Sequence, residues 1–136
     1  MSSVIRKFEK IEKTLNKMAV DSEKGIPILV EGKKDKSSLR RLSIKGKIIC
    51  IKSNRGNLQD QLRTMKSFNE IIVLTDFDHE GMKLAKILEN ELIFEKIKPN
   101  LLFWKDLKKV AGHDLNAIEG LCTYFHKLKL KIKKII

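Results

Sequence analysis

Two aspartates, Asp76 and Asp78, directly follow the apolar run from Ile71 to Leu74. Such a short run, rich in β-branched residues, is typical of a buried strand in a parallel sheet. Ligands bind at the carboxyl ends of such strands, and residues two apart on an extended segment point the same way. Two close carboxylates repel each other unless a cation lies between them, and Mg²⁺ prefers oxygen ligands. The pair is therefore a candidate metal site, although two aspartates at this spacing alone are more often solvated loop residues.

A third carboxylate, Glu31, stands at the end of another apolar run, Ile26 to Val30. Taken alone, Glu31 could simply complement the dipole of a following helix. Gly32 next to it would let the backbone turn sharply before that helix. Glu31 can act together with the two aspartates only if the strands that carry them are neighbours in the sheet.

The chain is strongly basic, with a formal net charge of +12 and a pI of about 9.8. Between Lys33 and Lys66, eleven lysines and arginines stand against only Asp35 and Asp60, and residues 126–136 carry five lysines and no acid. A basic excess argues for a polyanionic partner, with nucleic acid first and a membrane surface as a weaker alternative. Carboxylates within a basic chain suit metal-assisted chemistry on phosphodiesters.

Length and composition point to one cytoplasmic domain. The 136 residues, 42% hydrophobic and 34% charged, are enough for a single modest core. No apolar run is long enough for a membrane span, and the N-terminus lacks a signal-peptide apolar region. Cys50 and Cys122 have neither metal-ligand spacing nor a disulfide-scaffold count, so we expect both to be reduced core residues.

The apolar pattern alternates between strands and helices. The predicted strands are 26–30, 47–51, 71–74 and 100–104, and the predicted helices are 2–20, 32–42, 57–67, 81–94 and one that opens near residue 116. Such alternation implies right-handed crossovers and a parallel sheet. A 2-1-3-4 strand order places the first and third strands side by side, with the ligand crevice between them. We therefore predict an α/β, Rossmann-like domain with a four-stranded, mainly parallel sheet flanked by helices.

The two ends of the chain leave alternatives open. The first helix carries an apolar stripe that could pack on its own domain or form a dimer seam: Val4, Phe8, Ile11, Leu15 and Met18. Residues 105–112 are expected to form a loop or short helical turn, and Asn116 with Glu119 has the form of a capping box. Residues 128–132 alternate between apolar residues and lysine, which allows an edge strand or a frayed basic arm. The predicted division is 1–24 for the N-terminal helix and connector, 25–128 for the domain and 129–136 for a basic tail.

Two motifs together resemble the toprim domain. Residues 30–35 read Val-Glu-Gly-Lys-Lys-Asp, and residues 74–81 read Leu-Thr-Asp-Phe-Asp-His-Glu-Gly. Toprim domains occur in type IA and type II topoisomerases, bacterial-type primases, OLD-family nucleases and a small ribonuclease that matures ribosomal RNA. The chain looks most like the small stand-alone toprim proteins of archaea and some bacteria. The resemblance covers about residues 25–128, and two motifs in this order are far more specific than either alone.

The resemblance implies a set of functional residues. It makes Glu31 the general acid/base in phosphodiester cleavage or transfer, and it makes Mg²⁺ or Mn²⁺ the cofactor. The implied metal ligands are Asp76 and Asp78, with Glu31 and Glu80 in the same acidic cluster, and the implied tight turns are at Gly32 and Gly81. A divalent ion can polarise a phosphoryl oxygen, and a nearby carboxyl group can carry the proton. Flanking phosphates could be held by Lys33, Lys34 and Arg55, although each alone is more often a solvated surface residue.

Other family activities do not fit this chain. A topoisomerase needs a tyrosine nucleophile on another domain, whereas Tyr124 lies in a predicted helix, and a primase needs a zinc module that two cysteines cannot supply. His79 and His113 are expected to be exposed loop residues rather than catalytic bases. For Phe103 and Trp104, core packing is the default and base stacking the alternative.

The main hypothesis is a Mg²⁺-dependent nuclease-like enzyme acting on RNA or DNA. The alternative is a non-catalytic nucleic-acid-binding toprim module or a subunit of a processing complex, and phosphotransfer on a small nucleotide is the third reading. The expected partner is nucleic acid, not a membrane. The N-terminal helix could also support a homodimer or a larger processing complex.

Overall fold

The computed structural model describes residues 3–52 and 56–135. At its centre lies a parallel sheet of four strands in the order β2-β1-β3-β4, which confirms the predicted order. The strands are β1 (Ile28–Val30), β2 (Ile48–Cys50), β3 (Glu70–Val73) and β4 (Lys98–Asn100). Because β1 lies between β2 and β3, the carboxyl ends of the first and third strands are adjacent.

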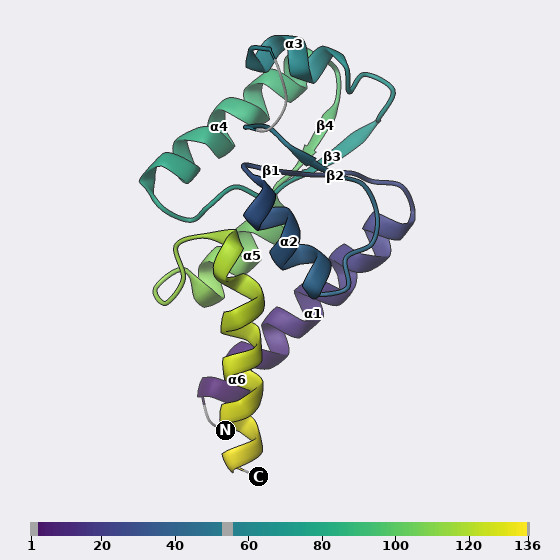
Figure 1. Cartoon of the computed structure of the whole chain (residues 1–136). Coiled ribbons are helices and arrows are strands. Elements are labelled where there is room, and N and C mark those ends of the chain that lie inside the picture. The colour runs from purple at the N-terminus through teal and green to yellow at the C-terminus, as the bar shows by residue number, and fades with distance from the viewer. Residues whose placement is uncertain (1–2, 53–55, 136) are drawn as a thin grey trace.

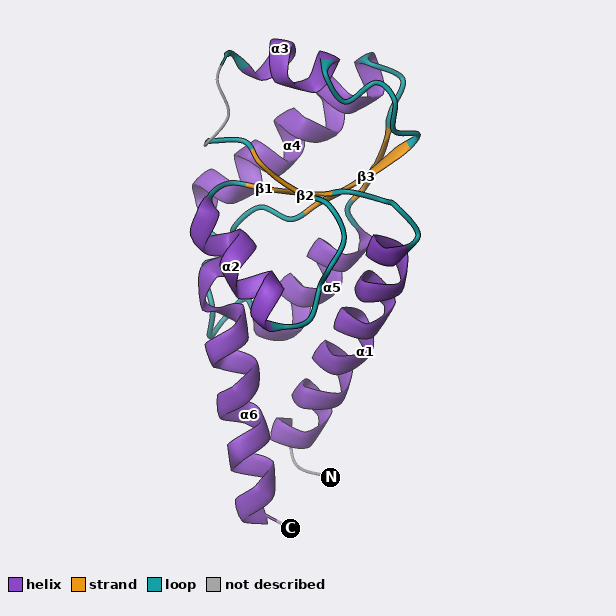
Figure 2. Ribbon diagram, turned by 45° about the vertical axis from the view of Figure 1, so that its right-hand side comes forward, coloured by secondary structure: helices purple, strands orange, loops and turns teal. Residues whose placement is uncertain are grey.

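Helices cover both faces of this sheet (Figures 1 and 2). One face carries α3 (Leu58–Arg63) and α4 (His79–Phe94), and the other carries α1 (Ser3–Glu23), α2 (Lys33–Arg41) and α5 (Leu102–Ala111). A 3₁₀ turn, η1 (Ile118–Gly120), leads into α6 (Leu121–Ile135), which extends away from the sheet (Figure 1). No helix in the described ranges is long and apolar enough to cross a lipid bilayer.

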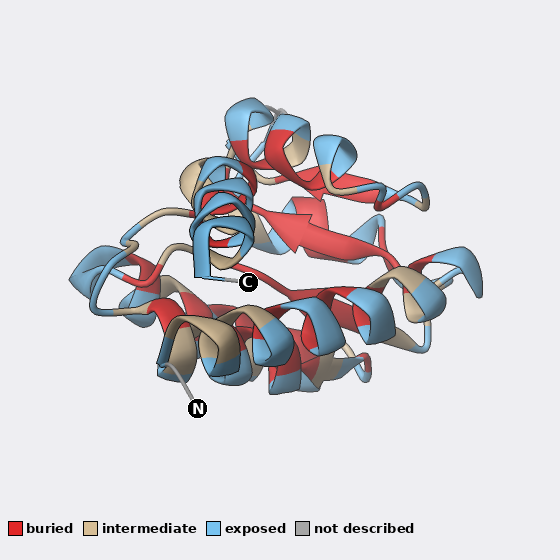
Figure 3. Ribbon diagram, turned by 90° about the horizontal axis from the view of Figure 1, so that it is seen from below, coloured by how far each residue is buried: buried red, intermediate tan, exposed pale blue. Residues whose placement is uncertain are grey.

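The strands β1, β2 and β3 are almost wholly buried, as parallel strands between helices should be, whereas the edge strand β4 begins exposed (Figure 3). Ile28 pairs with Ile48 on one side and with Ile72 on the other. The Leu74 N–H continues the ladder by donating to the Leu29 carbonyl. This register brings Glu31, just after β1, level with the residues just after Leu74.

The apolar stripe of α1 packs on its own chain. Ile11, Leu15 and Met18 are buried, and the helix contacts α5 and α6. The Phe8 ring stacks on the Phe125 ring of α6, with the ring centroids 4.8 Å apart. The first of the two alternatives for this stripe is therefore the one observed.

The predicted fourth strand at residues 100–104 is wrong. The strand is β4, which contains Pro99, and helix α5 begins at Leu102. Proline is tolerated because β4 is an edge strand. The Asn100 side chain ends the strand: its oxygen accepts from the Leu102 N–H, and its amide donates to Glu70. The apolar run after Asn100 thus belongs to a helix, and residues 105–111 continue that helix up to its C-cap at Gly112 instead of forming a loop or short helical turn.

The predictions for the C-terminal segment also need correction. Residues 128–132 are neither an edge strand nor a frayed arm, because α6 runs on to Ile135. Leu121 and Leu128 are buried one helical heptad apart, whereas Leu130 and Ile135 are exposed, so the apparent alternation does not define a buried strand face. The predicted capping box is absent too. The Asn116 carbonyl accepts from the Phe77 N–H, and the 3₁₀ turn begins after Ala117 without a side-chain cap.

Truncating Phe8 tests the packing of α1. We expect Phe8→Ala to lower the free energy of unfolding by about 2 kcal/mol, because the ring is half-buried and stacked. Lys10→Ala on the exposed side of the same helix should change it by less than about 0.5 kcal/mol. Urea unfolding measures the free energy of unfolding of both variants, and sedimentation in parallel measures their oligomeric state. Unchanged stability together with loss of a dimer would favour the dimer seam.

Candidate functional site

Glu31 and Asp76 meet at the carboxyl edge of the sheet, where β1 and β3 end. Glu31 is only 8% exposed, and its Oε2 accepts a hydrogen bond of 2.9 Å from the Asp76 N–H. Its other oxygen, Oε1, lies 3.2 Å from Nζ of Lys52. Lys52 follows β2, so the end of a third strand contributes to the same place. Both oxygens of Glu31 therefore have partners that fix the orientation of the carboxylate.

The Asp76 carboxylate lies in a negatively charged environment. Burial raises its pKa from the ordinary 3.8 to about 6, and the nearby charges of Glu31, Asp35 and Asp78 push it the same way. A hydrogen bond of 2.9 Å from the Ile118 N–H to its Oδ1 opposes the rise. Ionising this carboxyl group is costly in the protein alone, so the site favours a cation or a proton at this position.

Asp35 adds a third carboxylate, and like Glu31 it is buried. It is 6% exposed and accepts a hydrogen bond of 3.0 Å from the Gly32 N–H. Burial raises its pKa, as do the charges of Glu31 and Glu119, although a backbone hydrogen bond from Glu119 partly offsets this. The N-terminal part of η1 therefore directs backbone N–H groups at both Asp35 and Asp76.

These groups line an open pocket of about 570 Å³. Its walls combine the carboxylates of Glu31, Asp35 and Asp76 with three lysines at its rim, Lys33, Lys34 and Lys52, all exposed. Such a pocket pairs an acidic floor with basic edges. Carboxylate oxygens can hold a hard cation, and ammonium groups can bind phosphates.

The loop that carries Asp76 is held in place by four hydrogen bonds besides the one from Ile118. The Thr75 hydroxyl donates to the Gly81 carbonyl, and the Trp104 indole N–H donates to the Thr75 carbonyl at 2.9 Å. The Asp76 N–H donates to the Glu31 carboxylate, and the Phe77 N–H donates to the Asn116 carbonyl. Trp104 is buried, as expected by default, and it positions the site loop instead of presenting a surface for base stacking.

Asp78 and Glu80 take different places from Asp76. Asp78 is the N-cap of α4, where its Oδ1 accepts from the Gly81 N–H at 2.7 Å, and Glu80 lies exposed in the first turn. Neither residue lines the pocket, although the charge of Asp78 acts on Asp76. Within residues 3–52 and 56–135, no three His, Cys, Asp or Glu side chains are grouped as a ready metal-binding cluster. Of the four predicted ligands, Glu31 and Asp76 lie together in the pocket, whereas Asp78 and Glu80 do not line it.

Gly32 and Gly81, the glycines of the two motifs, differ in whether the structure requires glycine there. Gly32 lies in the bend between β1 and α2 with extended backbone (φ −145°) and open space where a Cβ would lie, so neither its conformation nor its surroundings require glycine. At Gly81, a Cβ would lie only 2.1 Å from the Asp76 carbonyl oxygen. Glycine is needed at position 81 because the first turn of α4 approaches the site loop closely.

The remaining predicted residues divide as follows. Lys33 and Lys34 lie at the pocket rim, whereas Arg55 falls outside the described residues. His79 and His113 are exposed. The Tyr124 hydroxyl donates to Asp114, and burial together with this contact raises its pKa to about 12, so it is a poor nucleophile.

Sequence reasoning missed Asp35, Lys52 and the η1 turn as parts of this site. Asp35 stands in the first motif, so its presence there was a usable signal. Lys52 could have been found from its place directly after the second strand, since the carboxyl ends of parallel strands share one edge. The backbone donors of Ile118 and Glu119 leave no mark on the sequence, because any non-proline residue has an N–H.

Comparisons with known proteins agree with this architecture. The family model of the Toprim domain matches residues 26–102. A UPF0292 protein of Methanosarcina barkeri is 32% identical over 127 residues, which is 93% of this chain and 87% of that protein. One of Pyrococcus furiosus is 35% identical over 124 residues, 91% of this chain and 90% of the other. A solved structure of a protein from Aquifex aeolicus has a TM-score of 0.67 and 24% identity, covering 79% of this chain and 94% of that one, which shows a shared fold.

Adding a methyl group at Gly81 tests how closely α4 approaches the site loop. We expect Gly81→Ala to lower the free energy of unfolding by about 2 kcal/mol or more, since backbone atoms must move to admit the Cβ. Gly32→Ala is the matched control and should change stability by less than about 0.5 kcal/mol. Urea denaturation at neutral pH measures both. Equal effects of the two substitutions would contradict the close approach.

The raised pKa of Asp76 predicts a pH-dependent stability difference. Because the folded protein holds this proton more tightly than the unfolded chain, ionisation of Asp76 lowers the free energy of unfolding as the pH rises from about 4 to about 6, and the full loss is present above pH 6. Asp76→Asn, which can still accept from Ile118, should raise the Tm by about 2–6 °C at pH 7.5. The gain should shrink as the pH falls through 6 and vanish near pH 4.

Asp106→Asn, an exposed carboxylate on α5, serves as the control and should show no such trend. Thermal unfolding without divalent ions, at several pH values, gives the comparison. A gain for Asp76→Asn that stayed constant from pH 4 to 7.5 would show that charge repulsion at Asp76 is not its cause.

Proposed function

Because this chain belongs to the toprim family, we propose that it is a Mg²⁺-dependent enzyme that cleaves or transfers phosphodiester bonds in nucleic acid. The family itself indicates a metal-dependent function related to nucleic acid. The nuclease activity, the metal ion and the polymer are the parts that we propose for this chain.

One observation carries the proposal. Carboxylates from two different strands, Glu31 and Asp76, share one open pocket whose rim is formed by lysines. This combination fits a phosphodiester, since the lysines can bind its charged oxygens while the acids serve a metal and a proton. A site for a neutral substrate would have no use for this charge pattern.

The donor set fits Mg²⁺ even though no three-residue cluster is preformed in the described part of the chain. Mg²⁺ is usually held by one or two carboxylates together with waters and substrate phosphates. Asp76 is the best first ligand because burial and the surrounding carboxylates raise its pKa, and Asp78 or Glu31 would be the second. Bound there, Mg²⁺ would neutralise charge on the phosphate and polarise a phosphoryl oxygen.

The protein groups have distinct roles in this proposal. Glu31 is the proton carrier, because it is buried and its oxygens are oriented by the Asp76 N–H and by Lys52. Lys33 and Lys34 bind the phosphates that flank the reacting one. Lys52 holds Glu31 in place and, being 71% exposed, can turn toward a bound phosphate.

A non-catalytic nucleic-acid-binding module is the second candidate. The observation in its favour is that Asp78 already caps α4 and Glu31 already pairs with Lys52. If these contacts persist in solution, the carboxylates serve structure and the lysines alone bind the polymer. The two candidates differ in whether Glu31 is needed for turnover.

Metal titration and cleavage, measured side by side, test the enzyme. We expect wild-type protein to bind Mg²⁺ or Mn²⁺ in calorimetry, and Asp76→Asn/Asp78→Asn to lose that binding. Glu31→Gln should lower the cleavage rate on mixed RNA and DNA substrates by about 100-fold or more while retaining nucleic-acid binding. Asp106→Asn should behave like wild type in both assays.

The outcomes separate the candidates. Metal binding and nucleic-acid binding without any cleavage would support the binding module. Cleavage that survives Glu31→Gln would remove Glu31 as the proton carrier. Metal binding unaffected by the double substitution would place the ion elsewhere and contradict the proposed site.

A further inference from the structure

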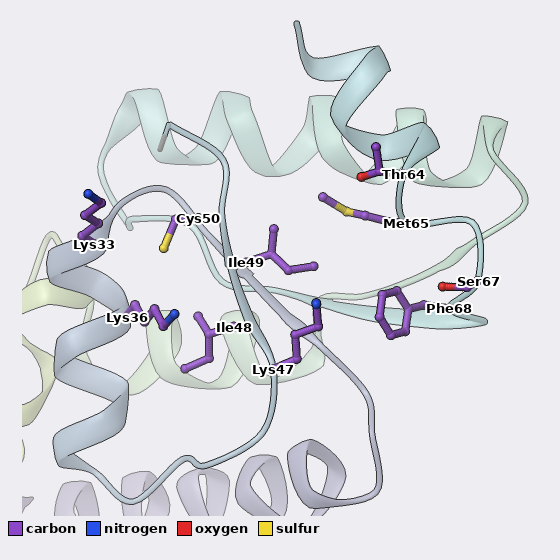
Figure 4. Close-up of a pocket in the computed structure, with 10 residues that line it drawn as sticks. All are labelled: Lys33, Lys36, Lys47, Ile48, Ile49, Cys50, Thr64, Met65, Ser67 and Phe68. Atoms are coloured by element: carbon purple, nitrogen blue, oxygen red, sulfur yellow. The ribbon is translucent and has the colours of Figure 1, made fainter. Parts of the chain in front are cut away.

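A second pocket, of about 700 Å³, lies along the edge strand β2; we call it the β2 groove (Figure 4). Its floor is formed by the strand itself, Ile48–Cys50. One wall is the first turn of α2, and the other is the segment 64–68 that follows α3. A pocket of this size is within the range that holds small organic ligands. It is larger than the pocket at Asp76, and of its lining residues only Lys33 has a role in the proposed chemistry.

The charges around the β2 groove all have one sign. Lys33 and Lys36 lie beside Cys50 at one end, and Lys47 lies at the start of β2 (Figure 4). None of the three forms an ion pair with another described residue. No carboxylate within the described residues lines the groove. Three unpaired ammonium groups around a concave surface favour a polyanion.

The floor and far wall suit a nucleobase. Ile48, Ile49 and Met65 are buried and form the apolar floor, and the half-buried Phe68 ring is the accessible apolar group, at the end opposite Lys33 (Figure 4). Thr64 and Ser67 add exposed hydroxyl groups next to it. Lysines along a groove combined with an aromatic ring are how proteins hold single strands, since every base has a face that can stack. In a duplex the bases face inward and cannot enter such a pocket.

The β2 groove is continuous with the candidate active site. Lys33 lines both pockets, and the carboxyl end of β2 lies at the same sheet edge as Glu31. A chain that leaves the site over Lys33 would run back along β2 toward Lys47. We infer that this groove is the binding track for single-stranded nucleic acid, an inference that rests on the proposed function and extends it to the substrate class.

An acidic polypeptide is the other polyanion that the charges would admit. It could add to the free edge of the sheet, but β2 offers only three residues for pairing. Such a peptide would also have no reason to continue over Lys33 into a pocket with an acidic floor. The observations therefore favour a nucleic-acid strand.

Binding measurements on the full chain test the track. Fluorescence anisotropy of a labelled 12-nucleotide single strand would be followed without divalent ions, so that neither metal nor cleavage matters. Lys36→Gln/Lys47→Gln should lower the affinity about 20-fold at 0.1 M salt and flatten the log–log salt slope by about 1.4, as expected for two lost phosphate contacts. Lys10→Gln/Lys13→Gln on α1 removes the same charge elsewhere and should change the affinity less than threefold.

Two further results are expected if the track is correct. A duplex of the same length should bind more weakly and should not distinguish the two double variants. A strand with 4-thiouridine at its end should crosslink to the segment 64–68. Equal losses in both double variants, or displacement by poly-glutamate at an equal concentration of negative charge, would overturn the inference.

Failure of the track and failure of the proposed function would look different. If the lysine variants bind as expected but wild type never cleaves with Mg²⁺, the β2 groove stands and the enzyme does not. If wild type cleaves and Lys36→Gln/Lys47→Gln binds and cleaves as well as wild type, the enzyme stands and the groove does not.

Discussion

The hydrogen bond from the Asp76 N–H to Glu31 joins the ends of the two central strands, and the rest of the site depends on it. It forms only because β1 and β3 are neighbours in a parallel sheet, so that their carboxyl ends meet at one edge. The same contact concentrates negative charge, since it holds the carboxylates of Glu31 and Asp76 in one pocket. The chain balances this charge mainly with backbone N–H groups, from Gly32 to Asp35 and from Ile118 to Asp76, and with one lysine. Backbone donors cannot neutralise a charge fully, which leaves the pKa of Asp76 raised.

Clustered carboxylates whose charge is only partly neutralised are what a site for a bound cation would require. Burial and neighbouring negative charge raise the pKa of Asp35 and of Asp76, which lowers the stability of the folded protein at neutral pH, and folds retain such groups where function requires them. The supporting contacts are correspondingly strong around Asp76. The Trp104 indole, the Thr75 hydroxyl and the close approach at Gly81 all fix the loop that carries it. Residues far apart in the chain thus hold a segment that would otherwise relax and separate the charges.

The sheet and the central pair of acids could be predicted from the sequence because both depend on local pattern. Buried runs such as Ile71 to Leu74 mark strands, and the order follows if Glu31 and Asp76 act together, because β1 and β3 must then be neighbours. The errors arose where tertiary contacts override that pattern. Leu101 to Trp104 has the composition of a strand, but Asn100 ends the preceding strand, and Phe103 and Trp104 are buried on α5 whereas Leu102 is exposed. The 3₁₀ turn at Ile118 owes its role to backbone N–H groups, which no residue type reveals.

The acidic pocket and the basic groove require each other electrostatically. A phosphodiester approaching Glu31 and Asp76 alone meets like charge, which opposes binding before any metal is shared with the substrate. Lysines placed along a neighbouring groove supply attraction at positions that do not react, and binding energy from such remote contacts can hold the reacting phosphate against that repulsion. Lys33 lines both the acidic pocket and the basic groove, and it therefore connects them. Under the proposed function, the basic excess of this chain would thus compensate for the carboxylates at the sheet edge.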